Sequence, residues 1–454
     1  MILDPLRSDR PSLTRRHFLR CGVALGAFLL PTTGQTQAVA PVRRRARGVI
    51  VLLLEGGMSH LESWDPKPAA PERIRGEFKA IKTTTAGLRL CEHLPLLAHQ
   101  ARLYNLIRSV HCDARNDHSP GLHLALTGHE NTEAGVSMQR VNLRHPAQGA
   151  VLARVLGEMT PGGVPRFVAL PKRTQLGGQV CYATPAFLGA ACEAFEAGDL
   201  PLTATHPMHA PPGLLLPGDV DLRRLQDRSA LKGALDRLNT GLDPDPALER
   251  MDAHYQRARQ MLTGPRMLHA LDVSREPITV RERFGNSPVG QGLVVARRLV
   301  EAGVTYVLVN PYSGAPWDTH AQNFTRHRSL LPPLDRAVSA LLVDLDQRGM
   351  LQDILVLVIS EMGRTPLVNK QAGRDHWTAA YSVMMAGGGL TRGQIVGSTT
   401  SGGQEPSSRP VTVSEILATV YHQLGVDSGV VVYDQQQRPV LILPAAKPVA
   451  ELIA

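Results

Sequence analysis

Uncharged apolar runs recur along the chain, and acids and histidines follow several of them. Residues 49–54, 304–309 and 354–359 are rich in Val, Leu and Ile and contain no charged side chain. Runs of this kind are typical of strands buried on both faces, as in a parallel sheet. Two further strands are predicted over 103–110 and 381–386. The pattern therefore indicates a large α/β domain.

The segment between the runs at 304–309 and 354–359 predicts a helix that ends near Gly349. Its apolar residues repeat at helical spacing: Leu334, Ala337, Val338, Leu341, Leu342 and Leu345. A strand, helix and strand in succession form a crossover unit whose two strands are parallel. The loops that follow these two strands should therefore open on the same edge of the sheet.

Those loops hold the candidate chemistry. Ligands bind at the carboxyl edge of open α/β sheets. Carboxylates and imidazoles together favour a metal ion or a phosphate-like anion, although ion pairs in a solvated loop would give a similar composition. We expect these residues to converge: Asp318, His320, Glu361, Asp375 and His376, with Arg364 and Arg374 beside them. Glu55, just beyond the run at 49–54, is the leading further ligand candidate.

A short helix is expected over 122–128, after the run at 103–110. Pro120 suits a first helical turn, and Ser119 is a candidate cap. The start of this helix would present free N–H groups to an anion. Further along the chain, Thr412 and Glu415 have the spacing of a capping box.

The first forty residues are typical of an export signal. Arg15 and Arg16 are followed by a short apolar run at 21–30 and by small residues at 38–40. The run is too short to span a bilayer as a helix, and a chance arginine pair before a core helix is the alternative. We interpret residues 1–40 as a twin-arginine signal peptide. The export machinery that reads this signal would be a partner, and the folded protein would reach the bacterial periplasm without a transmembrane segment in the mature chain.

Residues 41–454 are expected to form one α/β domain. The weaker pattern from about 200 to 290 contains a Pro-rich loop and two Arg-rich helical stretches, near 219–239 and 248–271. We interpret it as a helical insertion and not as a separate domain.

Charge and composition narrow the choice of ligand. The formal net charge is +9. Five Arg and two Asp place +3 of it within residues 1–40, which leaves +6 for the rest. A moderately basic exported protein suits anionic substrates or surfaces. Aromatic residues make up only 4% of the chain and leave few stacking platforms, so we expect no nucleic-acid partner.

Five cysteines are present. In an oxidising periplasm Cys181 could pair with Cys192, and Cys91 with Cys112. Buried free thiols remain the alternative, because spacing does not determine pairing.

The order of motifs resembles a bacterial exported family called domain of unknown function 1501. The motifs span nearly the whole chain: Gly56-Gly57-Met58-Ser59, Trp64-Asp65-Pro66-Lys67, His118 before Leu126-Thr127-Gly128, Trp317-Asp318-Thr319-His320, Glu361-Met362-Gly363-Arg364-Thr365-Pro366 and Gly373-Arg374-Asp375-His376-Trp377. That family is grouped with sulfatases and alkaline phosphatases. The resemblance implies a three-layer α/β/α sandwich with a mostly parallel central sheet and a metal site at its carboxyl edge.

The resemblance also implies an incomplete metal site. Asp318, His320 and His376 match one set of ligands in the superfamily. The second set is reduced to Glu55 and Glu361, because Met362 stands where a histidine would be expected. At the aligned position of the usual nucleophile stands His118, and Cys112 does not replace it, because Arg115 comes one position too early for the sulfatase modification motif.

These expectations lead to a metal-dependent hydrolase of sulfate or phosphate esters. One divalent ion would be held by Asp318, His320 and His376, and mixed N and O ligands favour zinc or manganese, with calcium possible. Arg364 or Arg374 would hold the anionic ester, and His118 would act as a ligand or general base for attack by water. The alternative is a non-catalytic member that binds a ligand in the periplasm or at the cell surface.

Overall fold

A nine-stranded sheet forms the centre of the protein. The computed structural model describes residues 44–453, except for 113–115, 131–143, 173–174, 177–178, 181–182, 207, 209–210, 212–213, 215–220, 239–254, 256–257, 263, 313 and 445. The interpreted signal at 1–40, Cys181 and Arg115 therefore lie outside the described residues. The strands follow the order β14-β4-β13-β10-β1-β9-β5-β8, and β17 also pairs with β4.

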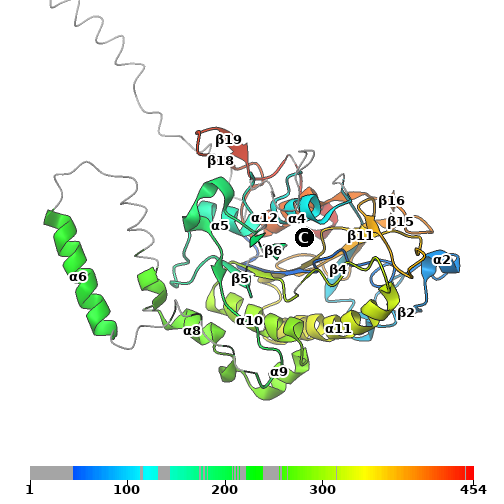
Figure 1. Ribbon diagram of the computed structural model, residues 1–454, viewed down its shortest axis with the longest axis horizontal. Coiled ribbons are helices and arrows are strands. Elements are labelled where there is room, and N and C mark those ends of the chain that lie inside the picture. Colours follow the sequence, from blue (N-terminus) through cyan, green and yellow to red (C-terminus); the bar gives the residue numbers. More distant parts are fainter. Residues whose placement is uncertain are drawn as a thin grey trace, which may run out of the picture. The chain divides into compact units, whose positions relative to one another are not determined.

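All neighbouring pairs in this sheet are parallel except those of β13, which runs against both β10 and β4. The strands are β1 (Gly48–Leu53), β4 (Tyr104–His111), β5 (Phe167–Leu170), β8 (Phe195–Glu196), β9 (Tyr306–Val309), β10 (Ile354–Ile359), β13 (Tyr381–Gly387), β14 (Ile395–Val396) and β17 (Val411–Thr412). The mostly parallel sheet predicted from the apolar runs is confirmed (Figure 1).

The described residues also contain small two-stranded sheets that are separate from the main sheet. They are β2 (Ala80–Lys82) with β3 (Arg89–Cys91), β6 (Gln175–Leu176) with β7 (Gln179–Val180), β11 (Gly363–Arg364) with β12 (His376–Trp377), β15 (Ser398–Thr399) with β16 (Pro406–Ser408), and β18 (Val431–Tyr433) with β19 (Pro439–Leu441). The pairing of β11 with β12 matters for function, because it shapes the loop that carries His376.

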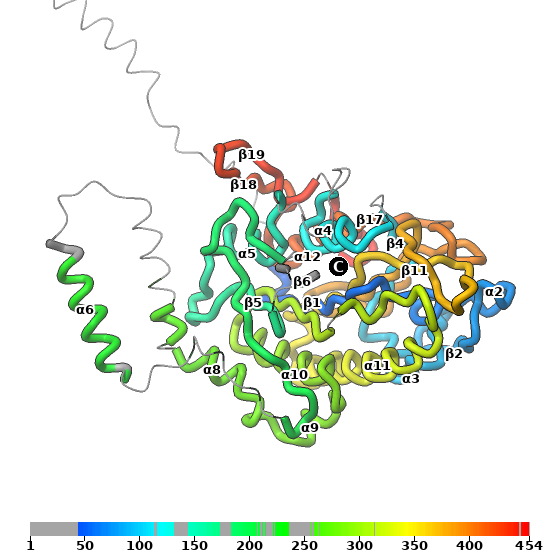
Figure 2. The backbone as a smooth tube through the Cα atoms, in the orientation of Figure 1, coloured from blue at the N-terminus to red at the C-terminus, as the bar shows by residue number. Residues whose placement is uncertain are grey.

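Helices cover both faces of the sheet, which explains why all six residues of β1 are buried. Ile50 and Leu52 belong to one apolar cluster, while Val49, Val51 and Leu53 belong to the other. The first cluster includes the buried faces of α3 (Pro95–His99), α8 (Pro265–Leu271), α9 (Ile278–Phe284), α10 (Pro288–Ala302) and α11 (Asn323–Gln347). The second includes those of α4 (His118–Thr127), α5 (Gln148–Leu156) and α12 (Val413–Gln423). Figure 2 shows the two layers on opposite sides of the strands.

Most of the elements predicted from local sequence patterns are present in the structure. The strand at 354–359 has the predicted bounds, the helix predicted over 334–345 lies within α11, and Thr412 and Glu415 form the predicted capping box. In the region interpreted as a helical insertion, the stretch near 219–239 contains α6 (Leu222–Leu238). The stretch near 248–271 is not one helix, because Gly264 and Pro265 start α8 anew.

Cys91, Cys112 and Cys192 are buried, and the Cys91–Cys112 disulfide that spacing allowed is not formed. Among the residues that the structure describes, no helix is long and apolar enough to cross a membrane.

Candidate metal centre

Four loops bring the candidate residues together at one edge of the sheet. Asp318 and His320 follow β9, Glu361 follows β10, His118 begins α4 beyond β4, and His376 belongs to β12. Because β4, β9 and β10 run in the same direction, their carboxyl ends share one edge. This is the edge at which open α/β sheets bind ligands.

Two glycines allow these loops to approach each other. Gly56 has φ +116°, and a Cβ at this position would collide with the backbone nitrogen of Asp318. A Cβ on Gly373 would collide with the carbonyl group of His320. Neither position can take a larger residue without separating the loops that carry the site.

Three histidines surround the carboxylate of Asp318 with their Nε2 atoms. Nε2 of His118 lies 3.3 Å from Oδ2 of Asp318. Nε2 of His320 lies 3.2 Å and Nε2 of His376 3.3 Å from Oδ1 of the same carboxylate. The Nε2 atoms of His320 and His376 are 3.0 Å apart. His118, Asp318 and His376 each present a ligand atom to the same small space, and the half-exposed His320 lies beside them.

The opposite ring nitrogen of each histidine is held by a group that can only accept a hydrogen bond. Nδ1 of His118 lies 2.8 Å from Oε1 of Glu361, and Nδ1 of His320 lies 2.9 Å from Oδ1 of Asp375. Nδ1 of His376 lies 2.8 Å from the carbonyl oxygen of Asn116. Each Nδ1 must therefore carry the proton, which leaves the Nε2 lone pair available in the neutral ring. Metal-ligating histidines are oriented in this way by carboxylates and carbonyls.

This geometry fits a metal ion. His118, Asp318 and His376 each offer a ligand atom within 4.8 Å of the others. Donors placed about 2.0–2.1 Å from a tetrahedral zinc ion stand about 3.3 Å from one another. The Asp318 carboxylate lies 3.3 Å from Nε2 of His118 and 3.3 Å from Nε2 of His376. Nε2 of His118 is buried and lacks a well-formed hydrogen bond, even with Asp318 close by. A metal would satisfy this nitrogen.

Electrostatics keep Asp318 ionised. Burial acts to raise its pKa, but the nearby imidazoles of His118 and His376, together with the Arg364 guanidinium, hold the pKa well below its usual range. Burial acts to lower the pKa of His118, but Asp318 and Glu361 outweigh it and raise the pKa to about 9. In the metal-free protein a proton therefore occupies the place that a metal would take, and metal binding must release it.

Glu55 lies at the same edge of the sheet, but its side chain is more deeply buried than that of Asp318. It is buried, and its Oε2 accepts a hydrogen bond of 2.6 Å from the side-chain amide of Asn310. Burial raises the pKa of Glu55 to about 7; the Asn310 hydrogen bond offsets part of this rise, and the charge of Glu361 adds to it. Among the described residues, the side chain of Glu55 forms a hydrogen bond with Asn310 and none with His118, His320 or His376.

Arg364 is a support for Asp318, and the sequence had suggested an anion-binding role. Its side chain is fully buried. Nε donates to the carbonyl oxygen of Gly57 at 2.9 Å, Nη1 to that of Arg374 at 3.2 Å, and Nη2 to Oδ1 of Asp318 at 2.6 Å and to the carbonyl oxygen of Gly56. The guanidinium ties loops together, so its donors are already engaged within the protein.

The guanidinium of Arg374 is likewise bound by groups within the protein. It is fully buried, and its guanidinium binds both carboxylate oxygens of Glu62 at 2.9 and 2.6 Å. Its remaining donors reach the carbonyl oxygens of Ile74, Thr365 and Pro366. This pair is part of the interior, whereas the sequence offered Arg374 as a ligand-binding residue.

The start of α4 has fewer free donors than the sequence suggested. The cap is Asp117 and not Ser119, because the Asp117 side chain accepts from the Ser119 backbone N–H at 3.3 Å. Pro120 has no N–H to offer. The first turn therefore contributes His118 to the site and little additional anion-binding capacity.

Of the residues selected from sequence, the structure brings His118, Asp318, His320 and His376 near one another. The group whose ligand atoms all lie within 4.8 Å of one another is His118, Asp318 and His376, so His118 takes the place that the sequence analysis gave to His320. Glu361 and Asp375 stand behind two of the histidines and orient them. Sequence reasoning missed the Asn116 carbonyl, which no side-chain pattern reveals. It also missed Asn310, although its position directly after β9 was a usable signal.

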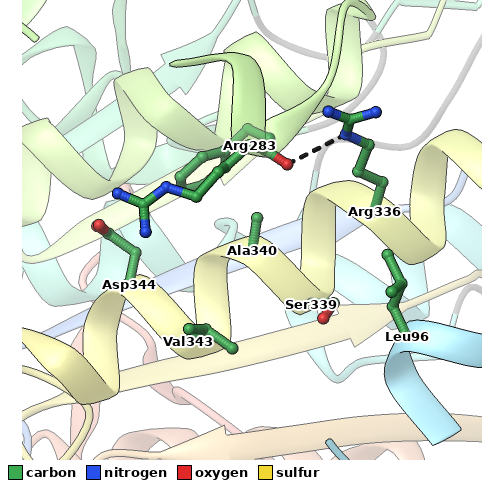
Figure 3. Close-up of a pocket in the computed structure, with 8 residues that line it drawn as sticks. Leu96, Arg283, Arg336, Ser339, Ala340, Val343 and Asp344 are labelled. Carbon is green, nitrogen blue, oxygen red and sulfur yellow. Dashed lines mark hydrogen bonds between the residues drawn. The ribbon is translucent and has the colours of Figure 1, made fainter. Parts of the chain in front are cut away.

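A separate cavity lies in the helical layer formed by α3, α9 and α11. It has a volume of about 170 Å³ and contains none of the candidate residues. Figure 3 shows Arg336 of α11 donating to the carbonyl oxygen of Arg283 across this cavity. The cavity is lined by Leu96, Arg283, Phe284, Arg336, Ser339, Ala340, Val343 and Asp344.

A family model for a protein of unknown function, DUF1501, matches residues 46–453. The chain belongs to the DUF1501 family. The match covers every residue of the metal centre described above, so the resemblance drawn from the motifs is confirmed. No curated protein matches the chain.

The chain is also similar to several solved structures at low sequence identity. The lipoteichoic acid synthase LtaP from Listeria monocytogenes is 9% identical, with a TM-score of 0.37 over 89% of this chain and 76% of that one. A sulfatase from Pseudoalteromonas sp. is 13% identical, with a TM-score of 0.32 over 85% and 68%. A phosphonate monoester hydrolase from Silicibacter pomeroyi is 12% identical, with a TM-score of 0.31 over 86% and 75%.

Replacing any one of the three histidines should weaken metal binding strongly. We expect His118→Ala, His320→Ala and His376→Ala each to lower zinc affinity by well over tenfold. Glu361→Gln and Asp375→Asn should cost about tenfold to a hundredfold, because they only orient ligands. Competition with a coloured chelator on metal-stripped protein measures these affinities. His327→Ala is the control, since His327 is buried against Asn323 outside the cluster; full affinity in all three ligand variants would refute the site.

Glu55→Gln should stabilise the metal-free protein at alkaline pH. The folded-state pKa of Glu55 is raised from 4.5 to about 7, so the folded form holds a proton that the unfolded form has lost. Wild-type stability should therefore fall as pH rises through this window, by up to about 3 kcal/mol, and the variant should lack that fall. Urea unfolding at pH 5 and pH 8 measures the difference. If added zinc instead stabilises wild type more than the variant, Glu55 is a ligand.

Arg374→Ala should destabilise the fold. It leaves Glu62 charged and buried, which costs about 3–5 kcal/mol. Replacing both partners, as Arg374→Met with Glu62→Leu, should restore much of that loss. Urea unfolding gives the free energies. A stable single variant with weakened binding of anionic esters would instead support the anion-binding role.

Proposed function

We propose that this protein is a metal-dependent hydrolase of sulfate or phosphate esters in which water, and not a protein side chain, attacks the ester. The observation that carries the proposal is the convergence of three Nε2 atoms on the Asp318 carboxylate at the carboxyl edge of the sheet. Three neutral imidazoles and one carboxylate suit zinc or manganese. When bound, such an ion would lower the pKa of water towards about 7 and polarise an ester oxygen.

The position of His118 supports attack by water. It begins α4, where the resemblance to sulfatases and alkaline phosphatases would place a nucleophile, but its Nε2 faces Asp318. Glu361 holds its Nδ1 and fixes this orientation. The chain thus offers an imidazole where a covalent mechanism needs a hydroxyl or thiol-derived group.

Ser119 is the remaining protein nucleophile to consider. Its side chain is buried and its Oγ makes no hydrogen bond within the described residues. A nucleophilic serine needs a base in hydrogen-bonding reach. One step along a helix also rotates a side chain by about 100°, away from the direction of His118.

A binding role is the second candidate, and one observation favours it. The group of His118, Asp318 and His376 would reach four ligands if His320 joined it, because Nε2 of His320 lies 3.2 Å from the Asp318 carboxylate. Four protein ligands are the number found in closed structural zinc sites. A catalytic ion needs an open position. Replacing zinc by cobalt and titrating with a small anion separates the two roles, because only an open site changes its visible absorption.

Hydrolysis assays on three proteins test the proposal. With zinc or manganese supplied, wild type and Ser119→Ala should hydrolyse a phosphate or sulfate ester from a broad panel, and His118→Ala should not. Bound metal is measured in each sample, which shows whether an inactive variant has also lost its metal. Inactivity of Ser119→Ala together with a trapped covalent adduct on Ser119 in the wild type would overturn the water mechanism. Inactivity of all three on the whole panel would favour the binding role.

A further inference from the structure

We propose that the site selects esters that carry a single negative charge, namely sulfate monoesters or phosphate diesters, and discriminates against doubly charged phosphate monoesters. The inference rests on the proposed hydrolase function and specifies its substrate. It follows from the charges that surround the three histidines.

Carboxylates outnumber available cations around the site. Asp318 lies among the Nε2 atoms, and Glu361 and Asp375 lie directly behind His118 and His320. Glu55 adds a fourth carboxyl group that interacts electrostatically with both Glu361 and His118. A ligand that approaches the Nε2 atoms therefore meets a negative environment on several sides.

The two arginines do not reverse this balance. Arg374 is neutralised by Glu62 through two short contacts within the interior. Arg364 contributes one positive charge, but its donors already bind Asp318 and three carbonyl groups. Neither guanidinium can form the two-pronged hydrogen bonds by which arginine usually binds a dianionic phosphate.

The charge balance then sets the preference. With Glu55 ionised, four carboxylates, the Arg364 guanidinium and one divalent ion leave the site with one net negative charge; with Glu55 protonated, the site is neutral. In neither case does the site have positive charge to compensate a dianion. When Glu55 is ionised, a singly charged ester meets half as much repulsion as a dianion. The buried charges of Glu55 and Glu361 are screened less by solvent than the charge of Asp375, whose side chain is 58% exposed.

The reaction remains balanced for either singly charged ester. The oxygen of water forms a bond to phosphorus or sulfur as the bond to the leaving oxygen breaks. One proton from the water goes to the leaving alcohol, and the other is released from the acid product to solvent. No oxidant, reductant or further reactant is needed.

Three aryl esters with the same leaving group test the preference at pH 8. These are p-nitrophenyl sulfate and methyl p-nitrophenyl phosphate, each singly charged, and p-nitrophenyl phosphate, which is doubly charged. Metal-loaded wild type should have a kcat/KM at least tenfold higher for one of the singly charged esters than for the dianion. Calorimetry gives a readout independent of turnover: dimethyl phosphate should bind at least tenfold more tightly than methyl phosphate.

A matched pair of variants tests the cause. Asp375→Asn removes one charge behind His320, and the amide oxygen of Asn can still accept a hydrogen bond from Nδ1 of His320. The variant should therefore reduce, at least threefold, the ratio of the Kd for methyl phosphate to the Kd for dimethyl phosphate. Asp353→Asn removes a half-exposed carboxylate just before β10, at the opposite end of that strand, and should leave the ratio unchanged. Metal content is measured in both variants, and ratios are compared at equal loading.

The outcomes separate this inference from the proposed function. Hydrolysis with a preference for the dianion, or an unchanged ratio in Asp375→Asn, overturns the charge selectivity and leaves the hydrolase standing. Failure to hydrolyse any of the three esters or the broader panel contradicts the hydrolase. In that case the calorimetry decides alone: tighter binding of dimethyl phosphate supports the selectivity, and equal or weaker binding overturns it.

Discussion

The carboxylate of Asp318 is the point at which the loops of this protein meet. It is contacted by His118 from α4, His320 from its own loop, His376 from β12 and Arg364 from β11. The side chain of Asp318 is 31% exposed, so its charge is partly buried and is stabilised by the positive and hydrogen-bonding groups around it. The contacts that compensate the charge of Asp318 also set the positions of the three imidazoles. The interactions that stabilise these loops therefore also position the candidate metal ligands.

The sheet makes that meeting possible. β1 lies between β9 and β10, and the loops after these strands must share an edge because the strands are parallel. Small residues then allow contact: Gly56 and Gly373 sit where a Cβ would strike the loop that carries Asp318 and His320. Arg364 fastens the loop after β1 to this assembly through the carbonyl groups of Gly56 and Gly57.

The fold was predictable because its signals are local and repeated. The runs that became β1, β9 and β10, and the helical spacing within α11, each determine an element without reference to the rest of the chain. The cluster was partly predictable for the same reason, since acids and histidines follow these strands. The roles of Arg364 and Arg374 were not, because their partners are mainly backbone carbonyl groups, which no side-chain pattern encodes.

A histidine at position 118 changes what its neighbours do. The resemblance drawn from the sequence implies a metal-ligand role for an acid in the position of Glu361, with a histidine next to it. Here Met362 is buried in the core, and Glu361 accepts from the Gly56 backbone and faces Nδ1 of His118. Glu361 is therefore placed to hold the imidazole of His118 with its Nε2 directed at Asp318. The side chain that begins α4 is in this way an imidazole oriented by Glu361, and not a hydroxyl or a thiol.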